Sequence, residues 1–302
     1  MATTVLVAGS TGMLGSQIAR HLLDQPDTDV RLLLRPSAPG HDGKRGVAGE
    51  LISRGAVAVT GDVTDPASLD PATAGVDVVV SALQGGPAVI VAGQVALAES
   101  AARNGARRFV PSDFAIDLFK APAGAPQFDM RRQADEIIDA LPLEVVHVLN
   151  GAFMDMMLDP NTAGIIDLNK ATATVWGTGE EPFNLTTVDD TARFTAKIAT
   201  DPADLAGVRY VSGAETTFNA IIDESERLSG KPLTRTTLGS AEDLRRITTD
   251  ASDPWSVVRE WYFLSMLTVP PFPTTDNERY PDARPTGLRE YLTAAHHAIF
   301  QS

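Results

Sequence analysis

The chain has 302 residues, of which 43% are hydrophobic and 21% charged, a composition typical of a folded globular protein and too apolar for a disordered one. Its 39 acidic and 25 basic residues give a formal net charge of −14, which disfavours binding to nucleic acid through a general positive field. The chain has no cysteine, which excludes disulfides, thiolate zinc sites, cysteine-ligated iron–sulfur clusters and cysteine nucleophiles. No segment approaches the roughly 20 apolar residues of a membrane helix, and the N-terminus lacks the basic region of a signal peptide. A cytoplasmic protein that binds no membrane is therefore expected.

The first half of the chain alternates short β-rich runs with helical patterns. Strands are predicted over residues 3–8, 30–34, 56–60, 76–82, 108–110 and 143–149. Helices are predicted between them, over residues 12–24, 47–54, 66–73, 87–104 and 128–140. Strands that are continuously apolar suit a parallel sheet covered on both faces. The alternation therefore predicts an α/β fold with a Rossmann-type, doubly wound parallel sheet.

The second half loses this alternation. Strands are predicted over residues 171–176 and 208–211, and helices over 188–200, 218–229, 256–267 and 287–300. We expect a dinucleotide-binding domain over residues 1–150 and a smaller C-terminal α/β substrate-binding portion over residues 151–302. Late strands of that portion can rejoin the main sheet.

A glycine-rich turn follows the first predicted strand. Residues 9–15 read Gly-Ser-Thr-Gly-Met-Leu-Gly, between a strand and a helix. Gly9 permits a tight turn, Gly12 allows the backbone to approach a pyrophosphate, and Gly15 allows close packing of the helix on the sheet. The helix N-terminus would then hold the diphosphate of a dinucleotide, the alternative being a purely structural turn. The predicted binding residues of this turn are Gly9, Thr11, Gly12, Met13, Leu14 and Gly15.

The end of the second strand distinguishes NAD from NADP. An acidic residue there would bind the ribose 2′-hydroxyl, but this chain has Arg35, with Lys44 in the next loop. These cations favour NADP(H), because they can bind a 2′-phosphate; the alternative is that they are solvated loop charges. Asp62 is a candidate acceptor for the adenine amino group. Residues after the fourth and sixth strands complete the predicted cofactor site: Ala82, Leu83, Gln84 and Asn150.

Further motifs extend the pattern along the chain. They are Arg-Arg-Phe-Val-Pro-Ser-Asp-Phe at 107–114, Asn-Gly-Ala-Phe at 150–153, Trp-Gly-Thr-Gly at 176–179, Thr-Val-Asp-Asp at 187–190, Leu-Ser-Gly-Lys at 228–231 and Tyr-Pro-Asp at 280–282. With the glycine turn, they make the chain resemble the isoflavone reductase-like and NmrA-like branch of the atypical short-chain dehydrogenases. The resemblance spans essentially the whole length. It implies an NADP(H)-binding Rossmann domain, a smaller substrate domain and a reductase activity.

The same resemblance implies a lysine that transfers a proton, on the helix after the Pro-Ser-acidic-Phe motif. Arg131 stands at that position here. A guanidinium stays charged, so Arg131 is predicted to stabilise negative charge near the nicotinamide rather than to transfer a proton. Ser112 is predicted to assist, and Lys120 is an alternative proton carrier. The other interpretation of Arg131 is an exposed residue of a charged helix face.

Apolar contacts with a substrate are predicted from Phe114, Phe153, Met154 and Met157. The histidines do not form a metal-binding pattern, so no metal is expected. The leading hypothesis is an NADPH-dependent reductase of a small, partly apolar or aromatic substrate, with a homodimer left open. The alternative is a non-catalytic NmrA-like protein that senses NADP(H) and binds another protein, which the loss of the lysine favours.

Overall fold

The computed structural model describes residues 2–36, 42–159, 164–167 and 170–300. The chain divides into two compact units and passes between them several times. The first unit comprises Met1–Phe114, Met130–Val148 and Thr191–Arg209, and the second comprises Ala115–Asp129, Leu149–Asp190 and Tyr210–Ser302. The division at residue 150 stays a prediction about which residues bind which ligand.

A seven-stranded sheet is the centre of the first unit. Its strands are β1 (Thr3–Ala8), β2 (Thr28–Leu34), β3 (Val57–Thr60), β4 (Val78–Ser81), β5 (Arg108–Val110), β6 (Glu144–Leu149) and β11 (Gly207–Tyr210). Their order is β11-β6-β5-β4-β1-β2-β3, and the pairs from β3 to β6 are parallel. The predicted doubly wound α/β fold is confirmed, and β11 is a late strand that joins the main sheet.

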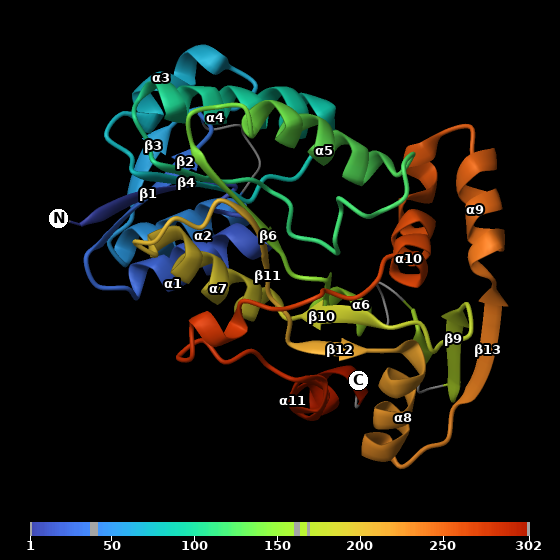
Figure 1. Ribbon diagram of the computed structural model, residues 1–302. Coiled ribbons are helices and arrows are strands. Elements are labelled where there is room, and N and C mark those ends of the chain that lie inside the picture. Colours follow the sequence, from blue (N-terminus) through green and yellow to red (C-terminus); the bar gives the residue numbers. More distant parts are fainter. Residues whose placement is uncertain (1, 37–41, 160–163, 168–169, 301–302) are drawn as a thin grey trace. The chain divides into compact units, whose positions relative to one another are not determined.

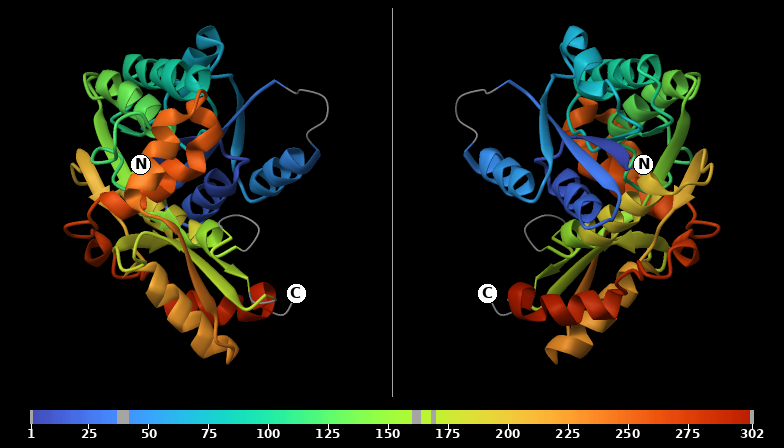
Figure 2. Two further views of the ribbon diagram at one scale, coloured as in Figure 1. Left: turned by 90° about the vertical axis from the view of Figure 1, so that its right-hand side faces the viewer. Right: turned by 90° about the vertical axis from the view of Figure 1, so that its left-hand side faces the viewer.

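Helices cover both faces of this sheet (Figure 1). One face carries α1 (Met13–Leu23), α2 (Asp42–Ser53) and α7 (Val188–Thr200), and the other carries α3 (Leu69–Thr73), α4 (Gln94–Arg103) and α5 (Pro126–Ile138). The short turns η1 (Pro66–Ser68) and η2 (Ala88–Gly93) precede α3 and α4. Figure 2 shows the same order of layers from two sides. None of the described helices is long and apolar enough to cross a bilayer.

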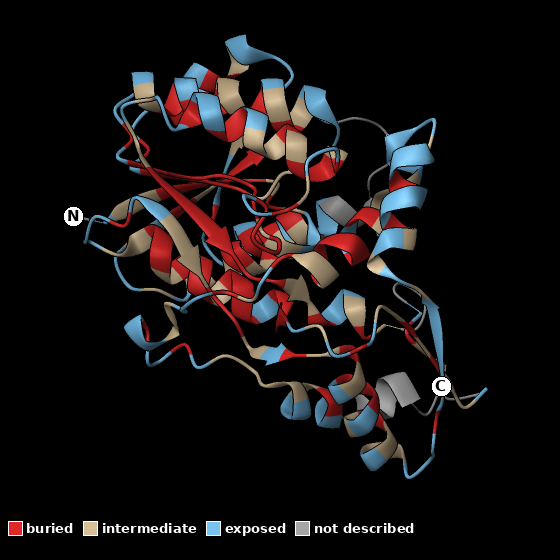
Figure 3. Cartoon of the chain, turned by 45° about the vertical axis from the view of Figure 1, so that its right-hand side comes forward, coloured by how far each residue is buried: buried red, intermediate tan, exposed pale blue. Residues whose placement is uncertain are grey.

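The central strands β1, β4, β5 and β6 are mostly buried, whereas the edge strand β3 is mostly exposed (Figure 3). Of the covering helices, α7 is buried over most of its surface. In β4, Val78, Val79 and Val80 have no exposed surface, which is why this segment reads as an unbroken apolar run. Val79 joins Leu97 of α4 and Ile138 of α5 in one core cluster.

The second unit contains two three-stranded sheets. Their strands are β7 (Ala152–Phe153), β10 (Phe183–Thr186) and β12 (Ala214–Thr216), and β8 (Ile166–Asp167), β9 (Thr172–Trp176) and β13 (Thr234–Gly239). The helical segments are α6 (Met154–Met157), α8 (Phe218–Ser229), α9 (Ala241–Asp250), η3 (Pro254–Val257), α10 (Val258–Thr268), η4 (Asn277–Arg279) and α11 (Leu288–Phe300).

Sequence patterns missed several of these elements, including β10, β13 and α9. β13 is mostly exposed and polar, so it has no apolar alternation to detect. α9 had a detectable start signal, because Ser240 and Asp243 form a reciprocal capping box at its N-terminus.

A buried arginine ties the sheet to the end of α7. Arg108 in β5 is fully buried. Its guanidinium donates to Glu144 Oε1 and Ala203 O at 2.6 Å each, to Asp201 O at 3.0 Å and to Ile198 O. Because one cation donates to all of these acceptors, its loss removes a donor from several buried carbonyls, while Glu144 keeps hydrogen bonds from Leu205 N and Arg107.

We expect Arg108→Ala to lower the free energy of unfolding by about 3–5 kcal/mol, since it breaks a buried ion pair on one side only. Arg103→Ala is the control, because Arg103 pairs with Asp70 at 2.7 Å while its side chain is 54% exposed. That exposed pair should be worth about 0–1 kcal/mol. Urea unfolding measures both; equal losses in the two variants would contradict the prediction.

Candidate functional site

The glycine turn packs tightly against β4 and α1. Gly9 has φ +78°, and a Cβ there would lie 2.3 Å from the carbonyl oxygen of Ala82. A Cβ on Gly15 would lie 2.3 Å from Gly9 O, so neither position accepts a side chain without movement of backbone. Helix α1 begins after Gly12 without a side-chain cap. Its first N–H groups therefore have no partner within the helix and suit an anion.

The predicted turn residues Gly9, Thr11, Gly12, Met13, Leu14 and Gly15 thus lie in one strand–turn–helix unit. Within it, Ser10 Oγ is buried and has no hydrogen-bond partner in the described part of the chain. This unsatisfied group is the kind of buried polar atom that a ligand can satisfy.

The predicted cations and Asp62 follow β2 and β3. Arg35 is exposed directly after β2. Asp62 Oδ1 accepts hydrogen bonds from Thr64 N at 2.9 Å and Thr64 Oγ1 at 2.8 Å. The backbone hydrogen bond from Thr64 is the main cause that lowers the pKa of Asp62, and the charge of Arg35 adds to it. The backbone of Lys44 lies in α2, but its side chain falls outside the described part of the structure.

Ser112 joins three elements at the carboxyl ends of β4 and β5. Its N–H donates to Gln94 Oε1 at 2.9 Å, its hydroxyl donates to Leu83 O at 2.7 Å, and its carbonyl accepts from Arg131 Nε at 2.7 Å. Ser112 is 5% exposed and Arg131 half-buried. The structure therefore brings together both predicted catalytic residues and Leu83, with Ala82 beside it and Gln84 exposed.

Gln94 is a residue of this site that no sequence motif indicated. Its buried Oε1 also accepts from Ser81 Oγ at 2.6 Å, so one carboxamide links the ends of β4 and β5. The signal was present, because Gln94 interrupts an otherwise apolar stretch in which a polar residue needs a partner.

A charged cluster lies next to Ser112. His147 Nδ1 is 2.8 Å from Asp113 Oδ2, and its Nε2 is 3.1 Å from Asp139 Oδ1. Burial by itself lowers the pKa of His147, but the hydrogen bonds with the two carboxylates outweigh it and raise the pKa to about 10. Burial, followed by the charge of Asp113, raises the pKa of Asp135 to about 9. Both shifts favour the protonated forms of the imidazole and of the Asp135 carboxyl group.

Asn150 is the predicted cofactor residue of the second unit. It is fully buried, its N–H donates to Ala115 O at 3.0 Å and its carbonyl accepts from Thr186 Oγ1 at 2.5 Å. Both polar atoms of its side-chain amide lack a hydrogen-bond partner among the described residues. The backbone therefore holds Asn150 in place while its amide remains unsatisfied.

The predicted substrate contacts differ in exposure. Phe114 in the first unit is half-buried, as are Phe153 and Met157 in the second. Met154 is fully buried, as a core residue is. These four assignments stay predictions.

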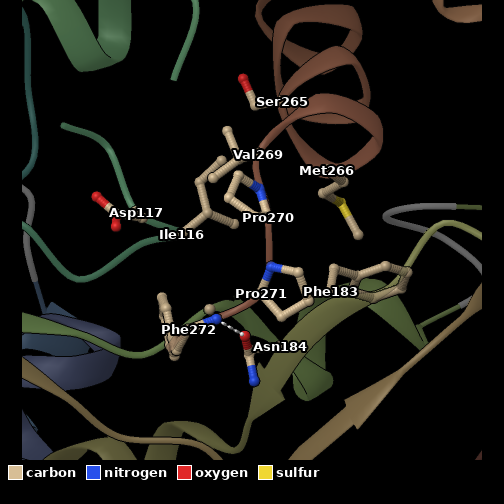
Figure 4. Close-up of a pocket in the computed structure, with 11 residues that line it drawn as sticks. Ile116, Asp117, Phe183, Asn184, Ser265, Met266, Val269, Pro270, Pro271 and Phe272 are labelled. Atoms are coloured by element: carbon tan, nitrogen blue, oxygen red, sulfur yellow. Dashed lines mark hydrogen bonds between the residues drawn. The ribbon is translucent and has the colours of Figure 1, made fainter. Parts of the chain in front are cut away.

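A small pocket lies in the second unit (Figure 4). Its apolar wall includes Phe183, Pro271 and Phe272, and the N–H of Phe272 donates to Asn184 Oδ1 at 2.8 Å. The cavity volume is about 10 Å³, which accommodates one water molecule and not an aromatic ring.

The alternative proton carrier, Lys120, is held by a carboxylate of the same unit. Asp117 Oδ2 lies 2.7 Å from Lys120 Nζ and accepts from the hydroxyl of Tyr210 at 3.0 Å. The hydrogen bond with Asp117 raises the pKa of Lys120, so this lysine is protonated at neutral pH and cannot act there as a base.

Comparison with known proteins finds one family model and several related sequences. The model of the NmrA-like family matches residues 1–265. Pinoresinol reductase 1 of Arabidopsis thaliana is 28% identical over 258 residues, covering 81% of this chain and 80% of the relative. Phenylcoumaran benzylic ether reductase POP1 of Populus trichocarpa is 26% identical, covering 97% of this chain and 99% of the relative.

Solved structures show the same similarity. AtPrR2 with NADP+ and (+)pinoresinol has a TM-score of 0.81 at 26% identity, covering 97% of this chain and 99% of that chain. An isoflavone reductase has a TM-score of 0.83 at 22% identity with the same coverage of both chains.

We expect Gly15→Ala to destabilise the protein by about 1–3 kcal/mol, because the added methyl group meets the Gly9 carbonyl. Gly46→Ala is the matched control, since Gly46 lies in α2 and a Cβ there meets nothing within 4 Å. Helix propensity predicts that the control stabilises the protein by about 0.5–1 kcal/mol. Thermal unfolding of both variants tests the opposite signs; the same sign in both would contradict the close packing of the turn.

Proposed function

Because the chain belongs to the NmrA-like family, we propose that it is an NADPH-dependent reductase of a small, aromatic or partly apolar substrate. The similarity to pinoresinol and phenylcoumaran benzylic ether reductases supports a reductase that acts on aromatic compounds. The observation that carries the proposal is the glycine turn, with its uncapped helix, inside a chain that is similar to such reductases over nearly its whole length.

The residues present fit NADP(H). A diphosphate suits the α1 N-terminus, where Gly9, Gly12 and Gly15 leave room for close approach of the backbone. The unsatisfied hydroxyl of Ser10 in the same turn offers a further hydrogen bond. The exposed cation of Arg35 suits a 2′-phosphate, and the bound cofactor would supply a hydride.

Arg131 has the role of an electrostatic group in this proposal. Its Nε donates a hydrogen bond to the Ser112 carbonyl. This bond fixes the position of the guanidinium at the end of β5. A guanidinium does not release its proton near neutral pH, so it would stabilise negative charge that develops on the substrate. The proton would then come from solvent.

Ser112 is a positioning residue in this proposal. Its hydroxyl already donates to Leu83 O, and its backbone is bonded to Gln94 and Arg131. Ser112 would therefore fix the positions of Arg131 and of the end of β4, and it would not deliver a proton. Half-buried Phe114, close to Ser112 in the chain, would offer an apolar contact to the substrate.

One observation favours a second function. Where the related reductases are expected to have a lysine, this chain has Arg131, which cannot transfer a proton. A protein that binds NADP(H), distinguishes its oxidation states and binds another protein would not need that lysine.

Turnover distinguishes the two functions. We expect NADPH oxidation with members of a panel of aromatic enones, quinones, imines and benzylic ethers. Arg131→Ala should lower kcat/KM by roughly 10²-fold, the usual loss on removing one group that stabilises transition-state charge, with a smaller change in NADPH affinity. Arg131→Lys keeps the charge, and Arg132→Ala is the control on the same helix.

Calorimetry with NADP+ and NADPH completes this experiment. Binding that discriminates the two forms, without turnover on the whole panel, would support the sensing function. Absence of binding to both nucleotides would contradict both functions.

Cofactor preference tests Arg35. We expect Arg35→Ala to raise the KM for NADPH by roughly 10-fold or more, the value of a charge-assisted hydrogen bond, and to leave the KM for NADH nearly unchanged. Arg103→Ala removes one exposed positive charge from α4 and serves as the control. Equal changes for NADPH and NADH would show that Arg35 does not bind the 2′-phosphate.

A further inference from the structure

Three ionisable side chains from separate segments are buried together at the end of β5. Asp113 follows β5, Asp135 lies in α5 and His147 lies in β6. Their exposed fractions are 0%, 2% and 4%. One ligand atom of each lies within 4.8 Å of the others, so one small ion could contact all three.

Most carboxylate oxygens of Asp113 and Asp135 have no hydrogen-bond partner among the described residues. Asp113 Oδ1 and both carboxylate oxygens of Asp135 are buried and lack hydrogen-bond partners among the described residues. A buried carboxylate needs a cation or a proton, because burial strongly disfavours an unpaired charge.

A fourth residue orients the imidazole. His147 Nε2 lies 3.1 Å from Asp139 Oδ1, whose side chain is 51% exposed. This contact turns Nδ1 toward Asp113, at 2.8 Å from its Oδ2. A carboxylate on one ring nitrogen and open donor atoms around the other is the arrangement by which proteins orient a metal-binding histidine.

We propose that Asp113, Asp135 and His147 form a site for one divalent first-row transition ion, with Asp139 as the residue that orients His147. Two carboxylates balance the charge of the ion, and one nitrogen with two oxygens suits Zn²⁺ better than Mg²⁺, which prefers oxygen ligands alone. The ion links the segments that carry Ser112 and Arg131. This inference is independent of the proposed reductase activity.

Histidine spacing along the sequence could not predict this site. The three residues are separated by 22 and 12 positions along the chain. Parallel pairing of β5 with β6 brings Asp113 and His147 together, and packing of α5 adds Asp135.

Zinc titration of the full chain, after treatment with a chelator, tests the proposal. Calorimetry should show one Zn²⁺ bound per chain, with little binding of Mg²⁺ at the same concentration. Asp135→Asn should weaken Zn²⁺ binding by more than roughly 100-fold, and Asp139→Asn by roughly 10- to 100-fold with the stoichiometry retained. His21→Gln, in α1, is the control for adventitious binding and should leave the affinity unchanged.

The absence of stoichiometric Zn²⁺ binding, or equal binding by the unmodified chain and a folded Asp135→Asn variant, would overturn the proposal. Circular dichroism establishes whether that variant folds. X-ray absorption of the zinc-loaded unmodified chain is a second measurement that needs no variant. A shell of nitrogen and oxygen ligands with one imidazole is expected, and a shell without imidazole would overturn the assignment.

Discussion

The arrangement of the candidate site depends on the hydrogen bonds of one buried residue, Ser112. Its N–H, hydroxyl and carbonyl are bonded to Gln94, Leu83 and Arg131, which come from α4, the end of β4 and α5. A buried polar group that loses its partner costs stability, so these bonds constrain each other. The loops at the carboxyl ends of two strands are therefore held at fixed separation, and the guanidinium of Arg131 takes its position from them. In a site of this kind, each residue supplies the hydrogen-bond partner of another, and these bonds keep the site rigid.

Charge is the second constraint. The chain carries a net charge of −14. Three of its arginines nevertheless stand at positions where one positive charge affects stability or ligand binding. Arg108 is buried and satisfies the carbonyls after α7, and Arg131 is half-buried at the end of β5. Arg35 remains exposed beyond β2, where an anionic cofactor group would meet it. The acidic surplus makes each of these positions distinctive, because anion binding cannot rest on the overall field.

The predicted and observed elements agree best where burial imposes a strong pattern. The strand at Thr3–Ala8 and the helices Val188–Thr200 and Phe218–Ser229 have the predicted bounds. The glycine turn was also predictable, because local backbone geometry determines the spacing of its glycines. By contrast, β13 is exposed and β10 has only four residues, so neither produces a readable pattern. Gln94 was visible as a polar interruption, but its partners were not.

Local periodicity and short motifs were enough to predict the doubly wound sheet, the glycine turn and the family resemblance. They also showed that Arg131 stands where a lysine was expected. The hydrogen bonds of Ser112 with Gln94, Leu83 and Arg131, and the buried cluster of Asp113, Asp135 and His147, become visible in the folded chain alone. The physical reason is that parallel strands and their crossover helices join residues distant in the chain. Spacing along the sequence does not encode which of those side chains meet.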